Sequence, residues 1–288
     1  MTDQTWLDVV AGLDPVADCQ WIHRVTATEE FPWDHRRALE FALFRTYCVP
    51  GISRLLSETG EFRDRPRRRY DDTALLMGEL VEYGYDSPRG REALRVVNHQ
   101  HRRHDIDAED MLYVLSTFVF EPIDWIDRYG RRPLHPHERE AAFHFYREVG
   151  RRMGIRDIPR DARAFRRWRE TYEARHFRYV DTNREIAEYT IGILATDFPR
   201  VCEPIVRTAV YALVDEPVRR AFGFPRVPAA VGRAAHGALS ARGAAAGAVP
   251  GRRRQRLVAD SVRQTYPDGY ALSEVGACPR STDTGGHR

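Results

Sequence analysis

The chain has 288 residues, 42% of them hydrophobic, which is enough for one large domain with a substantial core. Its formal net charge is only +3, from 45 basic and 42 acidic residues interleaved along the chain, whereas a nucleic-acid binder usually segregates a basic face. All 45 basic residues are arginines. Chemistry that needs a lysine, such as a Schiff base or the phosphate grip of a P-loop, is therefore excluded.

The cysteines and the apolar runs narrow the class further. The four cysteines are far apart and form no CxxC pair, which argues against a zinc ribbon and against covalent c-type haem attachment. No secretory signal opens the chain, and the apolar run from Met111 to Phe120 is too short to span a bilayer. We expect no transmembrane segment and a cytoplasmic protein with free thiols.

Helical spacing of apolar residues begins near the N-terminus. Apolar residues recur three and four positions apart over residues 35–47, and Pro50 interrupts the pattern. A second amphipathic stretch covers residues 71–84. Both stretches predict helices.

Start and stop signals delimit the next two helices. Ser87 and Pro88 provide an N-cap and a proline at the first helical position, and the helix that they begin is expected to run into VVNHQHRRHDID, residues 96–107. Asp107 can cap the following helix, which Gly130 can end. The apolar run within it predicts a buried core helix.

The remaining stretches with helical periodicity are residues 135–154, 161–177, 183–199 and 201–224. Alternating strand patterns are scarce. We therefore predict an all-α fold, a single large helical domain of roughly ten helices.

The composition changes near Pro228, so the helical domain is expected to cover residues 1–227. Residues 228–276 are expected to form an Ala/Gly/Arg-rich helix and linker, followed by a Tyr-Pro-Asp-Gly-Tyr segment with turn chemistry that packs on the domain. Residues 277–288 are expected to be a disordered tail.

Three histidines lie within six residues of VVNHQHRRHDID: His99, His101 and His104. On a helix from Pro88, His101 and His104 continue the stripe of Leu94 and share a face, whereas His99 points elsewhere. A histidine on an apolar stripe is more often a satisfied core residue than a ligand.

Several metal sites compete with that interpretation. A zinc site needs a third ligand that no motif supplies, because HExxH is absent. A carboxylate-bridged di-iron bundle needs two Glu-x-x-His motifs, and the chain has one, from Glu173 to His176. A b-type haem needs only one neutral imidazole beside an apolar pocket. Spacing alone leaves these alternatives open.

The surrounding residues resemble the mpaB-type oxygenases, which share their catalytic domain with rubber oxygenase, the latex-clearing protein. The resemblance covers roughly residues 10–275 and is carried by residues 41–62 (FALFRTYCVPGISRLLSETGEF), 67–84 (RRRYDDTALLMGELVEYG), 93–159 (from ALRVVNHQH to GIRDIP) and 264–276 (QTYPDGYALSEVG). It implies that the all-α fold encloses one non-covalent b-type haem.

The resemblance also implies roles for single residues. His101, in NHQH, matches the family's axial ligand to the haem iron, with His104 as the alternative. Arg69 and Thr73, in RYDDT, match a distal arginine and a threonine four residues later. Latex-clearing proteins have a lysine just before the threonine, where this chain has Asp72. This reversal of charge argues against carrying over the rubber enzyme's distal chemistry and its polymer substrate.

Other interpretations of these residues stay open. Arg69 belongs to a basic run and can pair with Asp71 or Asp72, and Thr73 can be an N-cap. Arg102, like Arg103 or His104, can contact the haem propionates or lie on a solvated face.

The function implied by the resemblance is that of a haem b-dependent oxygenase. It would use dioxygen to cleave a carbon–carbon double bond in a hydrophobic, isoprenoid-type or natural-product substrate. Three alternatives remain: a haem-free helical binding protein, a haem monooxygenase that tailors a small natural product, and a member that contacts membranes peripherally through the arginines at 252–254. No nucleic-acid partner is expected, and the oligomeric state stays open.

Overall fold

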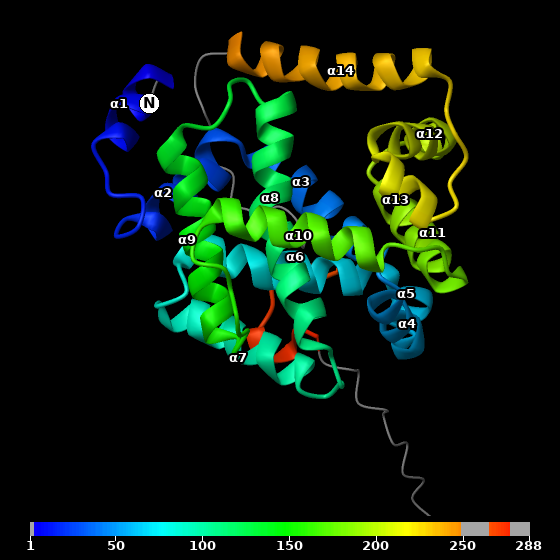
Figure 1. Ribbon diagram of the computed structural model, residues 1–288, viewed down its shortest axis with the longest axis horizontal. Coiled ribbons are helices and arrows are strands. Elements are labelled where there is room, and N and C mark those ends of the chain that lie inside the picture. Colours follow the sequence, from blue (N-terminus) through cyan, green and yellow to red (C-terminus); the bar gives the residue numbers. More distant parts are fainter. Residues whose placement is uncertain (1–2, 249–264, 277–288) are drawn as a thin grey trace, which may run out of the picture.

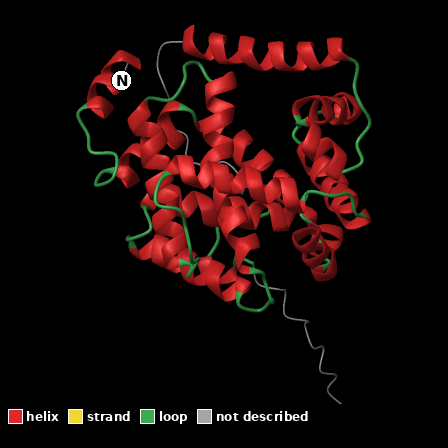
Figure 2. Ribbon diagram, viewed as in Figure 1, coloured by secondary structure: helices red, strands yellow, loops and turns green. Residues whose placement is uncertain are grey.

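The computed structural model describes residues 3–248 and 265–276 (Figure 1). Within these residues the chain forms fourteen α-helices, one π-helical turn and two 3₁₀ turns, and no strand (Figure 2). The predicted all-α fold is confirmed. The helices outnumber the roughly ten predicted because several are only one or two turns long.

The first half of the chain contains α1 (Asp3–Ala11), α2 (Cys19–Val25), the π-helical turn η1 (Thr26–Glu30), α3 (Pro32–Thr46), α4 (Pro50–Thr59), α5 (Glu61–Asp64), α6 (Pro66–Tyr83), α7 (Pro88–His101) and α8 (Ala108–Tyr129). The second half contains α9 (Pro136–Arg152), α10 (Ala162–His176), α11 (Asp181–Ala195), η2 (Arg200–Cys202), α12 (Glu203–Leu213), α13 (Glu216–Ala221), α14 (Ala229–Ala248) and η3 (Leu272–Glu274).

Prolines and side-chain caps set many of the helix starts. A proline occupies the first or second position of α3, α4, α6, α7, α9, α12 and α13. Proline suits this position because its fixed φ is helical and its missing N–H would have no partner there. The predicted caps are confirmed: Ser87 Oγ accepts from the amide of Gly90 at 2.9 Å, and Asp107 accepts from the amide of Glu109 at 2.7 Å.

Helix α8 forms the centre of the fold. It packs along α3, and α9, α10 and α14 also contact it (Figure 1). Most of its side chains are buried, including Phe118, Val119 and Phe120, so the predicted core helix is confirmed. Because most of α8 is apolar, surrounding helices are needed to remove it from water, while Asp124, Asp127 and Arg128 remain exposed.

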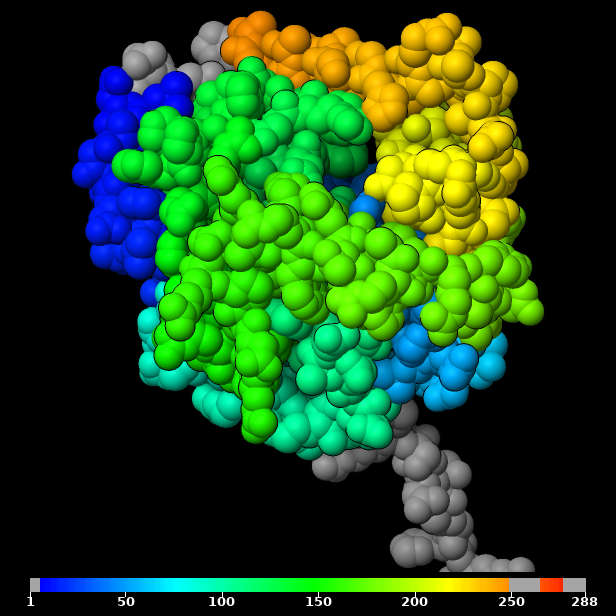
Figure 3. Space-filling model, in the orientation of Figure 1, coloured from blue at the N-terminus to red at the C-terminus, as the bar shows by residue number. Residues whose placement is uncertain are grey.

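The C-terminal part of the chain reaches over both ends of this core. Helix α14 lies across one edge of the molecule and contacts α8 and α12. Figure 3 shows a hollow beneath α14, between α8 and α12–α13, with α3 visible at its floor. Residues 265–276 lie at the opposite edge beside α6 and α7 (red in Figure 1). The predicted linker after α14 and the predicted tail lie outside the described residues.

Asn183 joins the subdomain of α11–α13 to the rest of the fold. Its side chain is fully buried, and its amide nitrogen donates to the carbonyls of Cys48 (3.2 Å), Arg178 (2.9 Å) and Ala221 (3.0 Å). Its amide oxygen accepts from Oγ of Ser53 at 2.6 Å. One side chain thereby satisfies polar groups from four segments of the chain.

The described residues contain no helix that is both long and apolar enough to cross a bilayer. Cys19 and Cys48 are buried free thiols, and Cys202 is a half-buried one.

We predict that Asn183→Ala lowers the free energy of unfolding by roughly 2–4 kcal/mol, because it leaves several buried backbone carbonyls and the Ser53 hydroxyl unpaired. Chemical denaturation measures the change. Asn98→Ala is the matched control, since Asn98 makes one exposed bond to the carbonyl of Arg152. Equal losses in the two variants would contradict this role of Asn183.

Candidate functional site

Helix α6 carries Arg69 and Thr73 one turn apart on the same face. The Arg69 guanidinium donates a hydrogen bond to Oγ1 of Thr73, and the Thr73 hydroxyl donates to the Arg69 carbonyl at 3.2 Å. The alternative role of Thr73 as an N-cap is wrong, because α6 already begins at Pro66. The two residues therefore act as one polar unit within the helix.

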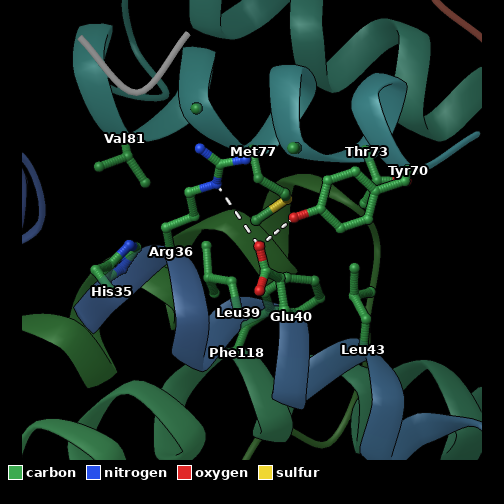
Figure 4. A pocket seen from close by; sticks show the side chains of 12 residues that line it. His35, Arg36, Leu39, Glu40, Leu43, Tyr70, Thr73, Met77, Val81 and Phe118 are labelled. Atoms are coloured by element: carbon green, nitrogen blue, oxygen red, sulfur yellow. Dashed lines mark hydrogen bonds and ion pairs between the residues drawn. The ribbon is translucent and has the colours of Figure 1, made fainter. Parts of the chain in front are cut away.

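Thr73 lines a pocket between α3, α6 and α8 (Figure 4). The apolar part of its lining consists of Leu39, Leu43, Ala74, Met77, Gly78, Val81 and Phe118. The polar part consists of His35, Arg36, Glu40, Tyr70 and Thr73. From Thr73 to Val81 the pocket follows α6 for about 12 Å, at 1.5 Å per residue. A long apolar wall with a few polar groups suits an elongated, mostly apolar ligand.

Glu40 is the acidic group of the pocket lining. It accepts a hydrogen bond from the Tyr70 hydroxyl, and its carboxylate lies 2.9 Å from the Arg37 guanidinium and 3.6 Å from Nε of Arg36 (Figure 4). Burial raises the pKa of Glu40, and the charge of Arg37 opposes that shift.

His101 lies at the C-terminal end of α7 and is half-buried. Its Nδ1 is buried and has no hydrogen-bond partner among the described residues. Burial, together with the charges of Arg69 and His104, lowers the pKa of His101 to about 4. The imidazole is therefore neutral at pH 7 and lies near Arg69, although it does not line the pocket that Thr73 reaches.

The prediction that His101 and His104 share a helix face is wrong. Helix α7 ends at His101, and Arg102 and Arg103 form a turn after it, so helical spacing no longer applies to His104. Arg102 and His104 are both exposed. The structure thus pairs Arg69 with Thr73 and places His101 near Arg69, and it leaves Arg102 and His104 exposed to solvent.

Asp72 faces the C-terminal segment, which here means residues 265–276. Its carboxylate accepts from the Tyr266 hydroxyl and, at 3.0 Å, from the amide of Gly276. Gln100, on α7, donates to the Gly276 carbonyl at 2.9 Å. The acidic residue that stands where the rubber enzyme has a lysine therefore has a structural partner in this chain.

The same segment covers two more carboxylates of α6. The Thr265 hydroxyl donates to Asp71, and the Tyr270 hydroxyl donates to Glu79, which is fully buried. Leu272 and Val275 of the segment enter the main hydrophobic core. The predicted packing of the Tyr-Pro-Asp-Gly-Tyr segment on the domain thus takes place on the outer face of α6.

Two buried histidines, His23 and His35, are site residues that the sequence interpretation missed. Both rings are almost fully buried, and burial lowers the pKa of both, that of His35 to about 4. His35 lines the pocket directly. A signal existed: His35 precedes Leu39 and Leu43 at intervals of four residues, which places all three on one face of α3.

The single Glu-x-x-His motif is part of an ion network. Glu173 accepts from Nε of Arg45 at 2.7 Å, from Nε of Arg169 at 2.9 Å and from the Tyr113 hydroxyl at 3.2 Å. His176 stacks on Tyr172, with ring centroids 4.2 Å apart. Within the described ranges, no cluster of three or more His, Cys, Asp or Glu side chains is arranged to hold a metal ion.

A known protein family and several individual proteins are similar to most of this chain. Residues 38–248 match the family model described as "ER-bound oxygenase mpaB/B'/Rubber oxygenase, catalytic domain". The ER-bound oxygenase mpaB of Penicillium roqueforti (strain FM164) is 32% identical over 219 residues, which is 69% of this chain and 73% of that protein.

Two relatives from Penicillium brevicompactum are similar to the same region. ER-bound oxygenase mpaB' is 30% identical over 219 residues, which is 69% of this chain and 52% of that protein. ER-bound oxygenase mpaB is 31% identical over 195 residues, which is 61% of this chain and 50% of that protein. The match thus covers about half the length of these two relatives.

We predict that His35 contributes to acid sensitivity. Its pKa falls from 6.5 in the unfolded chain to about 4 in the folded protein, so the unfolded state binds more protons between these values. This contribution is fully present above pH 6.5 and is lost as the pH falls to 4. The shift corresponds to roughly 3 kcal/mol.

Denaturation curves of the wild type and His35→Leu at pH 7 and pH 4 measure this contribution. The wild type is expected to lose more stability than the variant over that range. His99→Leu, at an exposed histidine, is the matched control and should follow the wild type. Identical losses in the wild type and His35→Leu would refute the prediction.

We also predict that Asp72→Lys releases the C-terminal segment, because it removes the acceptor of two hydrogen bonds and brings a positive charge toward Tyr266 and Gly276. Hydrogen exchange of the amides in residues 265–276 should accelerate at least about tenfold. Asp105→Lys, at an exposed aspartate, should leave the rates unchanged. Unchanged exchange in Asp72→Lys would show that Asp72 does not hold the segment.

Proposed function

The chain belongs to the mpaB and rubber oxygenase catalytic-domain family, and on this basis we propose that it is a haem b-dependent oxygenase. We propose that it uses dioxygen to cleave a carbon–carbon double bond in an isoprenoid-type or other hydrophobic natural-product substrate. The observation that carries the proposal is the neutral imidazole of His101 near Arg69, whose hydrogen-bond partner Thr73 lines an apolar pocket.

The residues present fit a b-type haem. An imidazole that ligates iron must be neutral, and burial keeps His101 in that form, with one ring nitrogen that has no hydrogen-bond partner among the described residues. His101 would hold the iron, and the exposed side chains of Arg102 and His104 would contact the propionates from the rim. When bound, haem supplies the redox chemistry with dioxygen that amino-acid side chains lack.

The protein's own residues bind and orient the reactants. Thr73 places its hydroxyl at one end of the pocket, and the Arg69 guanidinium bonded to that hydroxyl favours a polar or negatively charged group there. The walls formed by Leu39, Met77 and Phe118 hold a hydrocarbon chain and exclude water. Glu40, with its raised pKa, can exchange a proton through its hydrogen bond with Tyr70.

A substrate smaller than a rubber polymer suits this chain. The Asp72 carboxylate accepts hydrogen bonds from Tyr266 and Gly276. It therefore differs from the lysine of latex-clearing proteins both in charge and in the direction it faces. We therefore propose a discrete small molecule as the substrate. A haem monooxygenase acting on a natural product remains the second candidate, and the products distinguish the two.

We predict a Soret band in the protein purified with haem supplied, and its loss in His101→Ala, because the iron loses its axial ligand. His99→Ala, at the exposed histidine of the same helix, is the matched control and should retain the band. A wild type without a Soret band would leave the haem-free binding protein as the function. A band that survives His101→Ala but disappears in His104→Ala would move the ligand to His104.

Turnover under labelled dioxygen separates the reaction types. We expect both labelled oxygen atoms in two carbonyl products, because cleavage of the double bond uses both atoms. One labelled oxygen in an alcohol would instead identify a monooxygenase.

Arg69→Leu should lower kcat by 10²-fold or more, the usual effect of removing a donor that stabilises developing charge.

A further inference from the structure

The pocket has a polar end that the proposed chemistry does not use. His35 lines the pocket and is 1% exposed, and in the part of the chain that the structure describes neither Nδ1 nor Nε2 has a hydrogen-bond partner. A buried polar group without a partner costs free energy, so native structures seldom leave both nitrogens of a buried ring unpaired. A ligand atom that bonds to the ring would remove this cost.

Further unpaired polar atoms lie behind His35. The His23 ring contacts it edge to face, with centroids 5.4 Å apart, and Nε2 of His23 has no partner. Tyr146 contacts His23 at 5.2 Å between centroids, and its buried hydroxyl is also unpaired. Stacking on Phe145, at 4.5 Å, holds the His23 ring in place. The unpaired atoms therefore form a group at one place in the fold.

This group lies at the opposite end of the pocket from Thr73. In Figure 4, His35 lies beside Val81 at one end, while Thr73 and Tyr70 lie at the other. Along α6 the two ends are about 12 Å apart. Between the two ends lie Leu39 and Met77, which face each other from α3 and α6, and the Arg36–Glu40 ion pair. His35 and Thr73 therefore line the same pocket on opposite sides of the Arg36–Glu40 ion pair.

We propose that His35 is a substrate-recognition residue that hydrogen-bonds a hydroxyl group at one end of a hydrocarbon-chain substrate. This inference rests on the proposed function and specifies its substrate class: an oxygen-bearing chain, such as an isoprenoid alcohol, rather than a pure hydrocarbon. The structure supports it with the position of the ring in the pocket lining and its two unpaired nitrogens.

The chemistry of the ring selects a hydroxyl. A neutral imidazole has one N–H donor and one acceptor nitrogen, and a hydroxyl group can both accept and donate. Burial keeps His35 neutral at pH 7, so it offers no charge to pair with a carboxylate. His23 and the aromatic rings around it fix the imidazole in position, so little freedom is lost on binding.

Calorimetric binding of farnesol and farnesene to the full chain, purified with haem supplied, tests the inference. The two probes share a fifteen-carbon chain and differ in the terminal hydroxyl. The ratio of farnesol affinity to farnesene affinity should fall about tenfold from the wild type to His35→Leu, as expected for one buried hydrogen bond. His35→Gln, which keeps a donor and an acceptor, should retain most of the ratio, and the exposed-site variant His99→Leu all of it.

An unchanged ratio in His35→Leu, or a wild type that binds neither probe, would overturn the inference. So would a Soret band that is lost in His35→Leu but kept in His101→Ala, since His35 would then be an iron ligand. Failure of the proposed function is seen separately, because a wild type without a Soret band rejects haem dependence whatever the affinity ratio. Thermal unfolding of His35→Leu checks that the variant folds. We expect it to fold, because replacing an unpaired buried imidazole by a similar apolar side chain costs little free energy.

Discussion

The site depends on the attachment of the C-terminal segment to α6. The outer face of this helix carries Asp71, Asp72 and Glu79, all buried, and buried carboxylates are costly unless they accept hydrogen bonds. The segment supplies bonds through hydroxyls and a backbone amide, and Arg67 and Arg89 also donate to Asp71 and Glu79. Because the outer face is satisfied in this way, the inner face of α6 can present Thr73 and Met77 to the pocket.

Many charged side chains elsewhere in this lysine-free protein are also paired, with arginine as the cation. Interleaved charges form ion networks at helix junctions: Arg45 and Arg169 hold Glu173 between α3 and α10, and Arg132 contacts both Glu30 and Glu138. The planar guanidinium suits these contacts because it can bridge two carboxylates at fixed angles. Pairing of this kind is consistent with the interleaving of the 45 arginines with acidic residues along the sequence.

Local rules account for what could be predicted from the sequence. Proline positions, the Ser87 and Asp107 caps and helical periodicity gave the elements, and a spacing of four placed Arg69 and Thr73 together. The features that could not be predicted from the sequence depend on tertiary contacts. No local sequence signal marks the end of α7 at His101, so none predicts that His104 lies apart from His101. The partner of Asp72 lies about 200 residues away, and the burial of His35 requires α2, α6 and α9 to meet around it.

The dependence of α6 on residues 265–276 also sets an order for biosynthesis. Asp72 and Tyr266 are separated by 194 positions, so the helix leaves the ribosome long before its partner is made. At typical elongation rates this interval is roughly 10 to 40 seconds. During that time the carboxylates of α6 have only water and arginines as partners. Until residues 265–276 are made, the outer face of α6 lacks the hydroxyls and the amide that bond to its carboxylates in the folded protein.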